Sequence, residues 1–366
     1  MKRSVQFFWY LLAFLLTLEI CVRADETWRW GAPFWGPYSF DTLMVDDDLG
    51  RRNRPYARFE KWVINGQGFQ GPELRIPKPE GVTRIGVAGA SEIFGLYENP
   101  GCDITSQLRI LLEKSSPGKF EVVNLSTPGM SIPRIVESYD RWIGKFDFDA
   151  VIFYPSAAMY LADKVPEFRR SVSIKSENSF GNDNSWNLRL PRKTWEMLRE
   201  RIPVWLQVKL KWIQIEFNRL NMTNGHIWRK NAPDERVELF RKHLMELVTI
   251  LQKNGTHVII ATHANRFQND STNENDPYML AWIRFIPKAS GASILDMELR
   301  SNQVIREIVA EHPVTVSDVE KKVGKNPDHF ADFAHFTDSG AALGAEAMKD
   351  SILTLFTLNR PFRCHL

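Results

Sequence analysis

The sequence is poor in the residue types that bind metals. Only 3 of its 366 residues are cysteines, and only 8 are histidines. The histidines form no HxH or HExxH pattern, and no Cys/His spacing typical of a zinc site is present. We therefore expect no metal centre.

An excess of one charge is also lacking. Lys and Arg number 47 against 44 Asp and Glu, which gives a net charge of +3. No basic run interleaved with aromatic residues is present, so we expect no nucleic-acid partner. Internal repeats and low-complexity tracts are absent as well. With 43% hydrophobic residues, the chain can bury a large core.

An apolar run occupies residues 5–22, directly after Lys2 and Arg3. Its length is close to what crosses a bilayer, and the basic pair predicts that the N-terminus is inside the cytoplasm and the rest outside. Residues 1–24 are thus a signal-anchor or a signal peptide. Cleavage after Ala24 would give an exported or periplasmic protein, but the bulky residues around that position favour a retained anchor. Glu19 and Ile20 fit a lipoprotein signal at Cys21 poorly.

Cysteines outside the cytoplasm tend to pair. Besides Cys21 the chain has only Cys102 and Cys364. We predict a disulfide between these two, which would tie down the tail of residues 361–366; two free thiols are the alternative.

Strand-like and helix-like segments alternate from residue 84 onward. This alternation predicts a parallel sheet covered by helices on both faces, a three-layer α/β sandwich. The expected strands are residues 84–88, 120–123, 150–154, 257–262 and 292–295. The expected helices are residues 104–114, 133–144, 234–254, 302–311 and 341–358, with a further one from Tyr278.

Ser91 lies in the sequence GASEIFG, residues 89–95, where the first strand gives way to a helix. Backbone N–H groups at a helix N-terminus favour the negative charge that acyl transfer develops. Ser91 is therefore a candidate nucleophile, with a helix N-cap as the alternative.

A candidate base and its orienting acid lie near the other end of the chain. Asp332 precedes His335 by three residues, just before the Ala-rich helix. At this spacing the carboxylate can hold Nδ1–H of the imidazole while Nε2 faces a serine. A loop histidine that caps the helix is the alternative.

Together the two ends resemble the SGNH, or GDSL-like, hydrolases, which pair a serine near the N-terminus with a C-terminal DxxH. The resemblance covers residues 84–358. It implies that the backbone N–H groups of Ser91 and Gly129 form the oxyanion hole. Ala158 stands where the family has an asparagine that donates a further hydrogen bond. Ser156 or a group from the insertion could replace this donor.

The resemblance implies a flavodoxin-like sheet and a serine esterase that needs no cofactor. From the location and the family habit, its substrate would be an O-acyl group, expected to be O-acetyl, on a carbohydrate or cell-envelope polymer. O-acyltransfer to a polysaccharide is one alternative. A catalytically degenerate member that binds glycan or acts as a scaffold is the other, since the asparagine is missing.

Two further segments flank or interrupt the expected catalytic domain of residues 81–360. Residues 25–80 are rich in aromatic residues and proline and predict an ordered arm. Residues 161–231 are a basic, Trp-rich helical insertion, which could be a lid, a sugar platform, a membrane-facing surface or a structural insertion with buried tryptophans. His263 follows a strand at the edge where α/β sheets bind ligands, so it is a candidate substrate contact; a loop histidine without a role is the alternative.

Overall fold

The computed structural model describes residues 2–47, 49–165, 167, 188–199, 201–220, 227–267, 273 and 275–358. The chain divides into two compact units. One consists of Met1–Gly68 with Ser173–Leu206, and the other of Phe69–Val172 with Gln207–Leu366. The segment 161–231, expected as one insertion, is therefore shared between the two units.

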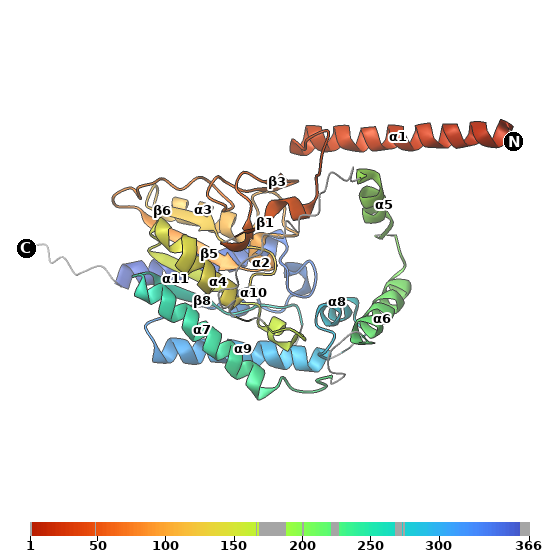
Figure 1. Ribbon diagram of the computed structural model, residues 1–366. Helices are drawn as coiled ribbons and strands as arrows, with labels where there is room; N and C mark the ends of the chain where they lie inside the picture. Colours follow the sequence, from red (N-terminus) through yellow and green to blue (C-terminus); the bar gives the residue numbers. More distant parts are fainter. Residues whose placement is uncertain are drawn as a thin grey trace, which may run out of the picture. The chain divides into compact units, whose positions relative to one another are not determined.

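The second unit is built on a five-stranded sheet (Figure 1). All neighbouring strands are parallel, in the order β6-β5-β7-β8-β9. The strands are β5 (Thr83–Gly89), β6 (Phe120–Asn124), β7 (Ala150–Tyr154), β8 (His257–Ala261) and β9 (Thr315–Ser317). In chain order this arrangement is 2-1-3-4-5, the flavodoxin-like order, which confirms the predicted fold class.

Helices cover both faces of this sheet. On one face, α3 (Ile104–Ser115) packs against α11 (Asp338–Leu358), and their apolar side chains form a core with alternate residues of the strands, among them Ile85, Ile152 and Ile259. On the other face lie α4 (Ile132–Ser138), α7 (Asp234–Lys253) and α9 (Gly291–Glu311), of which α7 contacts both of the others. Successive residues of a strand point to opposite faces, so the fully buried run of β7 serves both layers.

Further elements complete this unit. They are α2 (Ser91–Phe94), η2 (Tyr139–Ile143), η3 (Gly144–Phe146), η4 (Ala157–Leu161), most of α6 (Val204–Leu220), α8 (Pro277–Phe285), α10 (Val319–Val323) and η5 (Pro327–His329).

The predicted strand at residues 292–295 is wrong. These residues form the first turn of α9, because Ser290 caps the helix by accepting a hydrogen bond from the backbone N–H of Ser293. The fifth strand is instead β9, which sequence inspection missed. It has only three residues, so it offers too few positions for an alternation of polar and apolar side chains to show.

The first unit contains α1 (Lys2–Trp30), η1 (Phe40–Leu43), the hairpin of β1 (Met44–Asp47) and β2 (Gly50–Asn53), the pair β3 (Arg58–Phe59) and β4 (Trp62–Val63), and α5 (Arg189–Arg199). Its aromatic residues pack together, with the rings of Phe59 and Trp62 stacked at 6.1 Å. Of the insertion's tryptophans that the structure describes, Trp195 and Trp205 are 61% and 63% exposed, whereas Trp212 and Trp228 are half-buried.

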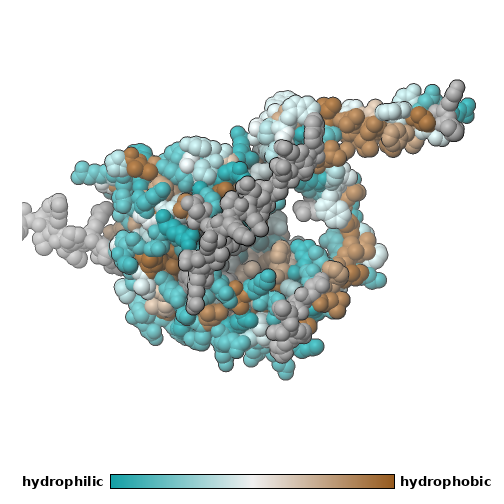
Figure 2. Space-filling view, viewed as in Figure 1, coloured by the Kyte–Doolittle hydropathy of each residue, from teal (hydrophilic) through white to brown (hydrophobic). Residues whose placement is uncertain are grey.

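Helix α1 is long and apolar enough to span a bilayer, with a mean hydropathy of 1.9 in its most apolar window. A signal sequence shares these properties. Figure 2 shows hydrophobic residues along much of this helix. Its C-terminal part carries polar contacts within the first unit. Glu19 accepts hydrogen bonds from Arg23 at 2.6 Å and from the backbone N–H of Leu190 at 2.8 Å, and Glu26 pairs with Arg189 at 3.2 Å.

Candidate active site

Ser91 is the first residue of α2, two residues beyond the end of β5. The N-cap is Ala90, so the N-cap alternative for Ser91 is wrong. The turn requires Gly89, because a Cβ there would lie 2.6 Å from Ile93 and 3.1 Å from the carbonyl oxygen of Tyr154. Gly95 ends the short helix in the left-handed conformation, with φ of 76°. The sequence therefore places Ser91 at the carboxyl edge of the sheet.

Asp332 and His335 lie on the loop between η5 and α11. One carboxylate oxygen of Asp332 accepts the backbone N–H groups of Ala334 and His335, both at 3.0 Å, which fixes the turn. The Nδ1 atom of His335 lies 2.8 Å from Oδ2 and 2.9 Å from Oδ1 of Asp332. The carboxylate thus selects the tautomer with hydrogen on Nδ1 and leaves Nε2 as an acceptor.

Nε2 of His335 lies 2.9 Å from Oγ of Ser91. The three residues singled out in the sequence thus form one hydrogen-bonded chain. Burial of His335 disfavours its charged form, but the hydrogen bond to Asp332 and the charge of Glu92 outweigh burial and raise its pKa above the ordinary value of 6.5. A base with a raised pKa accepts a proton readily.

Gly129 and Ala158 line the same pocket as Ser91. Gly129 adopts φ of 72°, a conformation that favours glycine. Ala158 presents only a methyl group, and its backbone N–H donates to Glu298 at 3.1 Å. The hydroxyl of Ser156 donates to Oε1 of Glu92 at 2.8 Å. Ser156 is thus present beside the nucleophile, but its hydrogen is directed to a carboxylate.

Glu92 is a site residue that sequence inspection missed. Its side chain is only 7% exposed, and its Oε2 lies 3.3 Å from Oγ of Ser91. The signal was available in the sequence, since Glu92 is the only charged residue in the short stretch SEIF. A carboxylate among buried neighbours needs a partner.

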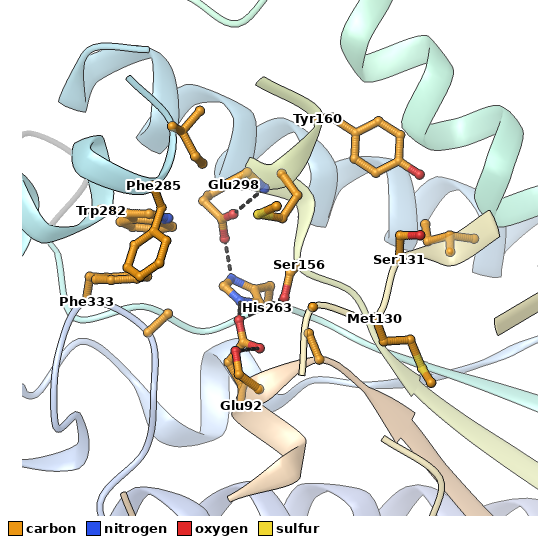
Figure 3. Close-up of a pocket in the computed structure, with 18 of the residues that line it drawn as sticks. Glu92, Met130, Ser131, Ser156, Tyr160, His263, Trp282, Phe285, Glu298 and Phe333 are labelled. Atoms are coloured by element: carbon orange, nitrogen blue, oxygen red, sulfur yellow. Dashed lines mark hydrogen bonds and ion pairs between the residues drawn. The ribbon is translucent and has the colours of Figure 1, made fainter. Parts of the chain in front are cut away.

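That partner is His263, which lies between two glutamates (Figure 3). Its Nε2 is 3.4 Å from Glu92, and its Nδ1 contacts Glu298 of α9. Asn302 fixes the backbone of His263, accepting its N–H at 2.8 Å and donating to its carbonyl at 2.9 Å. His263 is therefore neither a loop histidine without contacts nor exposed; it belongs to a buried array with Glu92 and Glu298.

The array holds opposite charges in contact. Burial disfavours the charge of His263, but the contacts with Glu298 and Glu92 outweigh it and raise its pKa to about 10. Burial likewise favours neutral Glu92, but the hydrogen bond with His263 and the positive charges of His335 and His263 lower its pKa to about 2. At neutral pH His263 is thus an imidazolium and Glu92 a carboxylate.

The pocket in front of Ser91 has a volume of about 310 Å³. On one side gather the rings of Trp282, Phe285 and Phe333 (Figure 3), with Trp282 stacked on Phe333 at 5.0 Å. The remaining lining is mixed, with apolar residues such as Met130, Ile132 and Met159 and the polar residues Ser131, Arg134 and Lys164. The aromatic side therefore suits an apolar group, and the polar residues could contact a hydroxylated or anionic one.

Among the described residues no group of three or more His, Cys, Asp or Glu side chains is arranged to hold a metal ion. Cys102 has a free thiol in the described part of the chain. Cys364 lies outside the described residues, so the disulfide between them stays a prediction.

No family model matches this chain, and no curated protein matches it. Solved structures with similarity include a lipase/acylhydrolase from Enterococcus faecalis, at 14% identity and a TM-score of 0.43, covering 75% of this chain and 97% of that one. An acetyl xylan esterase from Geobacillus stearothermophilus has 14% identity and a TM-score of 0.42, covering 74% and 94%. A lipolytic protein of the G-D-S-L family from Desulfitobacterium hafniense has 11% identity and a TM-score of 0.40, covering 74% and 99%. These similarities are too weak to assign an activity to this protein, so the proposal below rests on the side chains of its own site.

Proposed function

We propose that this protein is a serine esterase that cleaves O-acyl groups through Ser91, His335 and Asp332. The proposal is carried by two successive hydrogen bonds. One joins Oγ of Ser91 to Nε2 of His335 at 2.9 Å, and the other joins Nδ1 of His335 to Asp332 at 2.8 Å. Ser91 and His335 line a pocket of about 310 Å³. A serine hydroxyl is a weak nucleophile, and an adjacent oriented base activates it.

In the first half of the reaction, Oγ of Ser91 attacks the ester carbonyl while Nε2 of His335 takes the hydroxyl proton. The backbone N–H groups of Ser91 and Gly129 would hold the oxyanion. The tetrahedral intermediate then collapses, and His335 gives its proton to the departing alcohol oxygen, which leaves an acyl group on Ser91. Asp332 stays ionised and stabilises the imidazolium.

The substrate class that we propose is an O-acyl group on a carbohydrate or cell-envelope polymer, with acetyl as the first acyl group to test. The aromatic wall formed by Trp282, Phe285 and Phe333 would face the acyl group. The polar side chains of Ser131, Arg134 and Lys164, which line the same pocket, would contact the alcohol. Transfer to a sugar hydroxyl would use the same acyl-enzyme and differs only in what attacks it.

The proposed location is outside the cytoplasm, with α1 as a retained anchor. Cleavage after Ala24 would remove Glu19 and Arg23, which are buried and bonded to each other and, through Glu19, to the backbone of α5. Folded protein should therefore stay in the membrane fraction after carbonate extraction and keep its first 24 residues. A mature N-terminus at Asp25 would contradict a retained anchor.

Labelling with a fluorophosphonate tests the proposal, because it reports an activated serine without knowledge of the substrate. Ser91 of the full-length protein should be labelled, and Ser91→Ala and His335→Ala should each abolish the label. Ser131→Ala is the matched control, since Ser131 lines the same pocket and should leave labelling intact. Labelling of another serine, or none in folded protein, would contradict the assignment.

A further inference from the structure

Glu92 forms no bond with the substrate in the acylation step as written, yet its carboxylate flanks the nucleophile. Oγ of Ser91 has two acceptors within reach, Nε2 of His335 at 2.9 Å and Oε2 of Glu92 at 3.3 Å. A hydroxyl carries one hydrogen and can donate to only one of them at a time. The contact with His335 is the shorter one, so we expect the hydroxyl to donate to Nε2. Oε2 of Glu92 is then a second acceptor close to Oγ.

The surrounding groups fix Glu92 in position and in charge. Its Oε1 accepts the hydroxyl of Ser156 at 2.8 Å and faces Nε2 of His263. His263 is in turn held by Glu298. An ionised carboxylate can only accept hydrogen bonds, so Oε2 can receive a hydrogen from a donor in the pocket. Glu92 itself lines that pocket together with Ser91 and His335.

Acylation removes the hydroxyl hydrogen that Nε2 of His335 and Oε2 of Glu92 could accept. Once Oγ of Ser91 carries the acyl group, it has no hydrogen for either His335 or Glu92. A water molecule has two hydrogens and can donate one to Nε2 of His335 and the other to Oε2 of Glu92. An alcohol has one hydroxyl hydrogen and can donate only to His335.

We propose that Glu92 orients the hydrolytic water in the acyl-enzyme and thereby favours hydrolysis over transfer to an alcohol. This inference rests on the proposed function. The water oxygen attacks the acyl carbonyl carbon while one water proton moves to Nε2 of His335. The other hydrogen stays on the water oxygen, bonded to Glu92. When the Oγ–acyl bond breaks, His335 returns the proton to Oγ of Ser91, and the carboxylic acid leaves.

The test is pre-steady-state hydrolysis of p-nitrophenyl acetate by the full-length protein and by Glu92→Gln. At a pH above the pKa of His335 in both proteins, the first p-nitrophenol molecule per enzyme should appear at a similar rate in both. The subsequent steady-state rate of Glu92→Gln should fall by about 10- to 100-fold, the worth of one hydrogen bond to a charged group. A burst of p-nitrophenol should therefore become visible in the variant.

The product ratio in the presence of methanol gives a second readout, which a loss of folding alone would not move. Relative to wild type, Glu92→Gln should increase the ratio of methyl acetate to acetate by a similar factor. Glu92→Asp keeps the charge but withdraws the carboxylate by one methylene, so it should act in the same direction. Ser156→Ala removes one partner of Oε1 but keeps the carboxylate, so its product ratio should change less than that of either Glu92 variant.

The outcomes separate this inference from the proposed function. A wild-type protein that a fluorophosphonate does not label would contradict the proposed function itself. If the wild type is labelled, but the Glu92 variants slow the first release of p-nitrophenol and the steady-state rate equally, with an unchanged product ratio, the role of Glu92 alone would be overturned. The same holds if neither Glu92 variant can be labelled, since Glu92 would then assemble the nucleophile rather than orient water.

Discussion

Nε2 of His335 lies 2.9 Å from Oγ of Ser91, although 244 residues separate them in the chain. The parallel sheet makes this contact possible, because Ser91 lies two residues beyond the end of β5 and the loop before α11 reaches the same edge of the sheet. Strand order places β5 beside both β6 and β7, so a switch point lies between β5 and β7. Open α/β sheets bind ligands at such a crevice.

Asp332→Asn should lower kcat by roughly 10⁴-fold, because an amide no longer enforces the productive tautomer of His335. The remaining amide oxygen can still accept the backbone N–H groups of Ala334 and His335, so the loop should keep its shape. Ester hydrolysis measured together with thermal unfolding checks this. Asp328→Asn, at an exposed position just before that loop, is the matched control and should keep full activity. A similar loss in both variants would show that the loop, not the tautomer, is the cause.

Ala158→Asn should raise the hydrolysis of aryl esters by up to about 100-fold, the usual worth of one oxyanion donor. The methyl group of Ala158 lines the pocket, and the hydroxyl of Ser156 is already directed to Glu92, so we expect this donor position to be vacant. Met159→Asn, with an amide one residue along in the same pocket, should give no such gain. An unchanged rate for Ala158→Asn with an intact fold would mean that another group already fills the position.

The pH profile of kcat/KM should show an acid limb with its midpoint above pH 6.5. His335 acts as a base only when neutral, and the hydrogen bond to Asp332 with the charges of Glu92 and Glu98 raises its pKa despite burial. Activity should therefore rise as the pH rises through this raised pKa. Glu92→Gln removes one of these charges and should move the midpoint toward lower pH. A midpoint at or below 6.5 in the wild type would argue against His335 as the base.

The buried array of Glu92, His263 and Glu298 should make stability depend on pH in two windows. The pKa of His263 is raised to about 10, so its contribution is fully present below pH 6.5 and is lost as the pH rises toward 10. The pKa of Glu92 is lowered to about 2, so its contribution is present above pH 4.5 and is lost as the pH falls toward 2.

Thermal unfolding of the wild type across both windows measures this dependence. His263→Gln should be less stable than wild type at pH 7 and should lose less of its remaining stability between pH 6.5 and 10. His312→Gln, which alters a histidine outside the array, is the control and should follow the wild type. Equal slopes for His263→Gln and wild type would mean that the imidazolium does not stabilise the fold.

The sequence alone determined the parts of this protein that depend on neighbours in the chain. Asp332 and His335 meet because a three-residue spacing lets one carboxylate hold both the backbone and the imidazole of a tight turn. Ser91 is placed by Gly89 and Gly95, and the alternation of apolar segments predicted the layered fold. These features follow from local geometry, which the order of residues specifies directly.

Only the tertiary structure decided which distant groups became partners. Nothing near His263 in the chain indicates that Glu298, 35 residues further on, and Glu92, 171 residues earlier, would enclose it. Glu298 lies on a helix whose neighbouring residues are buried, and a helical pattern alone does not tell which element it faces. The array exists because β8, α2 and α9 meet at the carboxyl edge of the sheet, where burial forces each charge to find an opposite one.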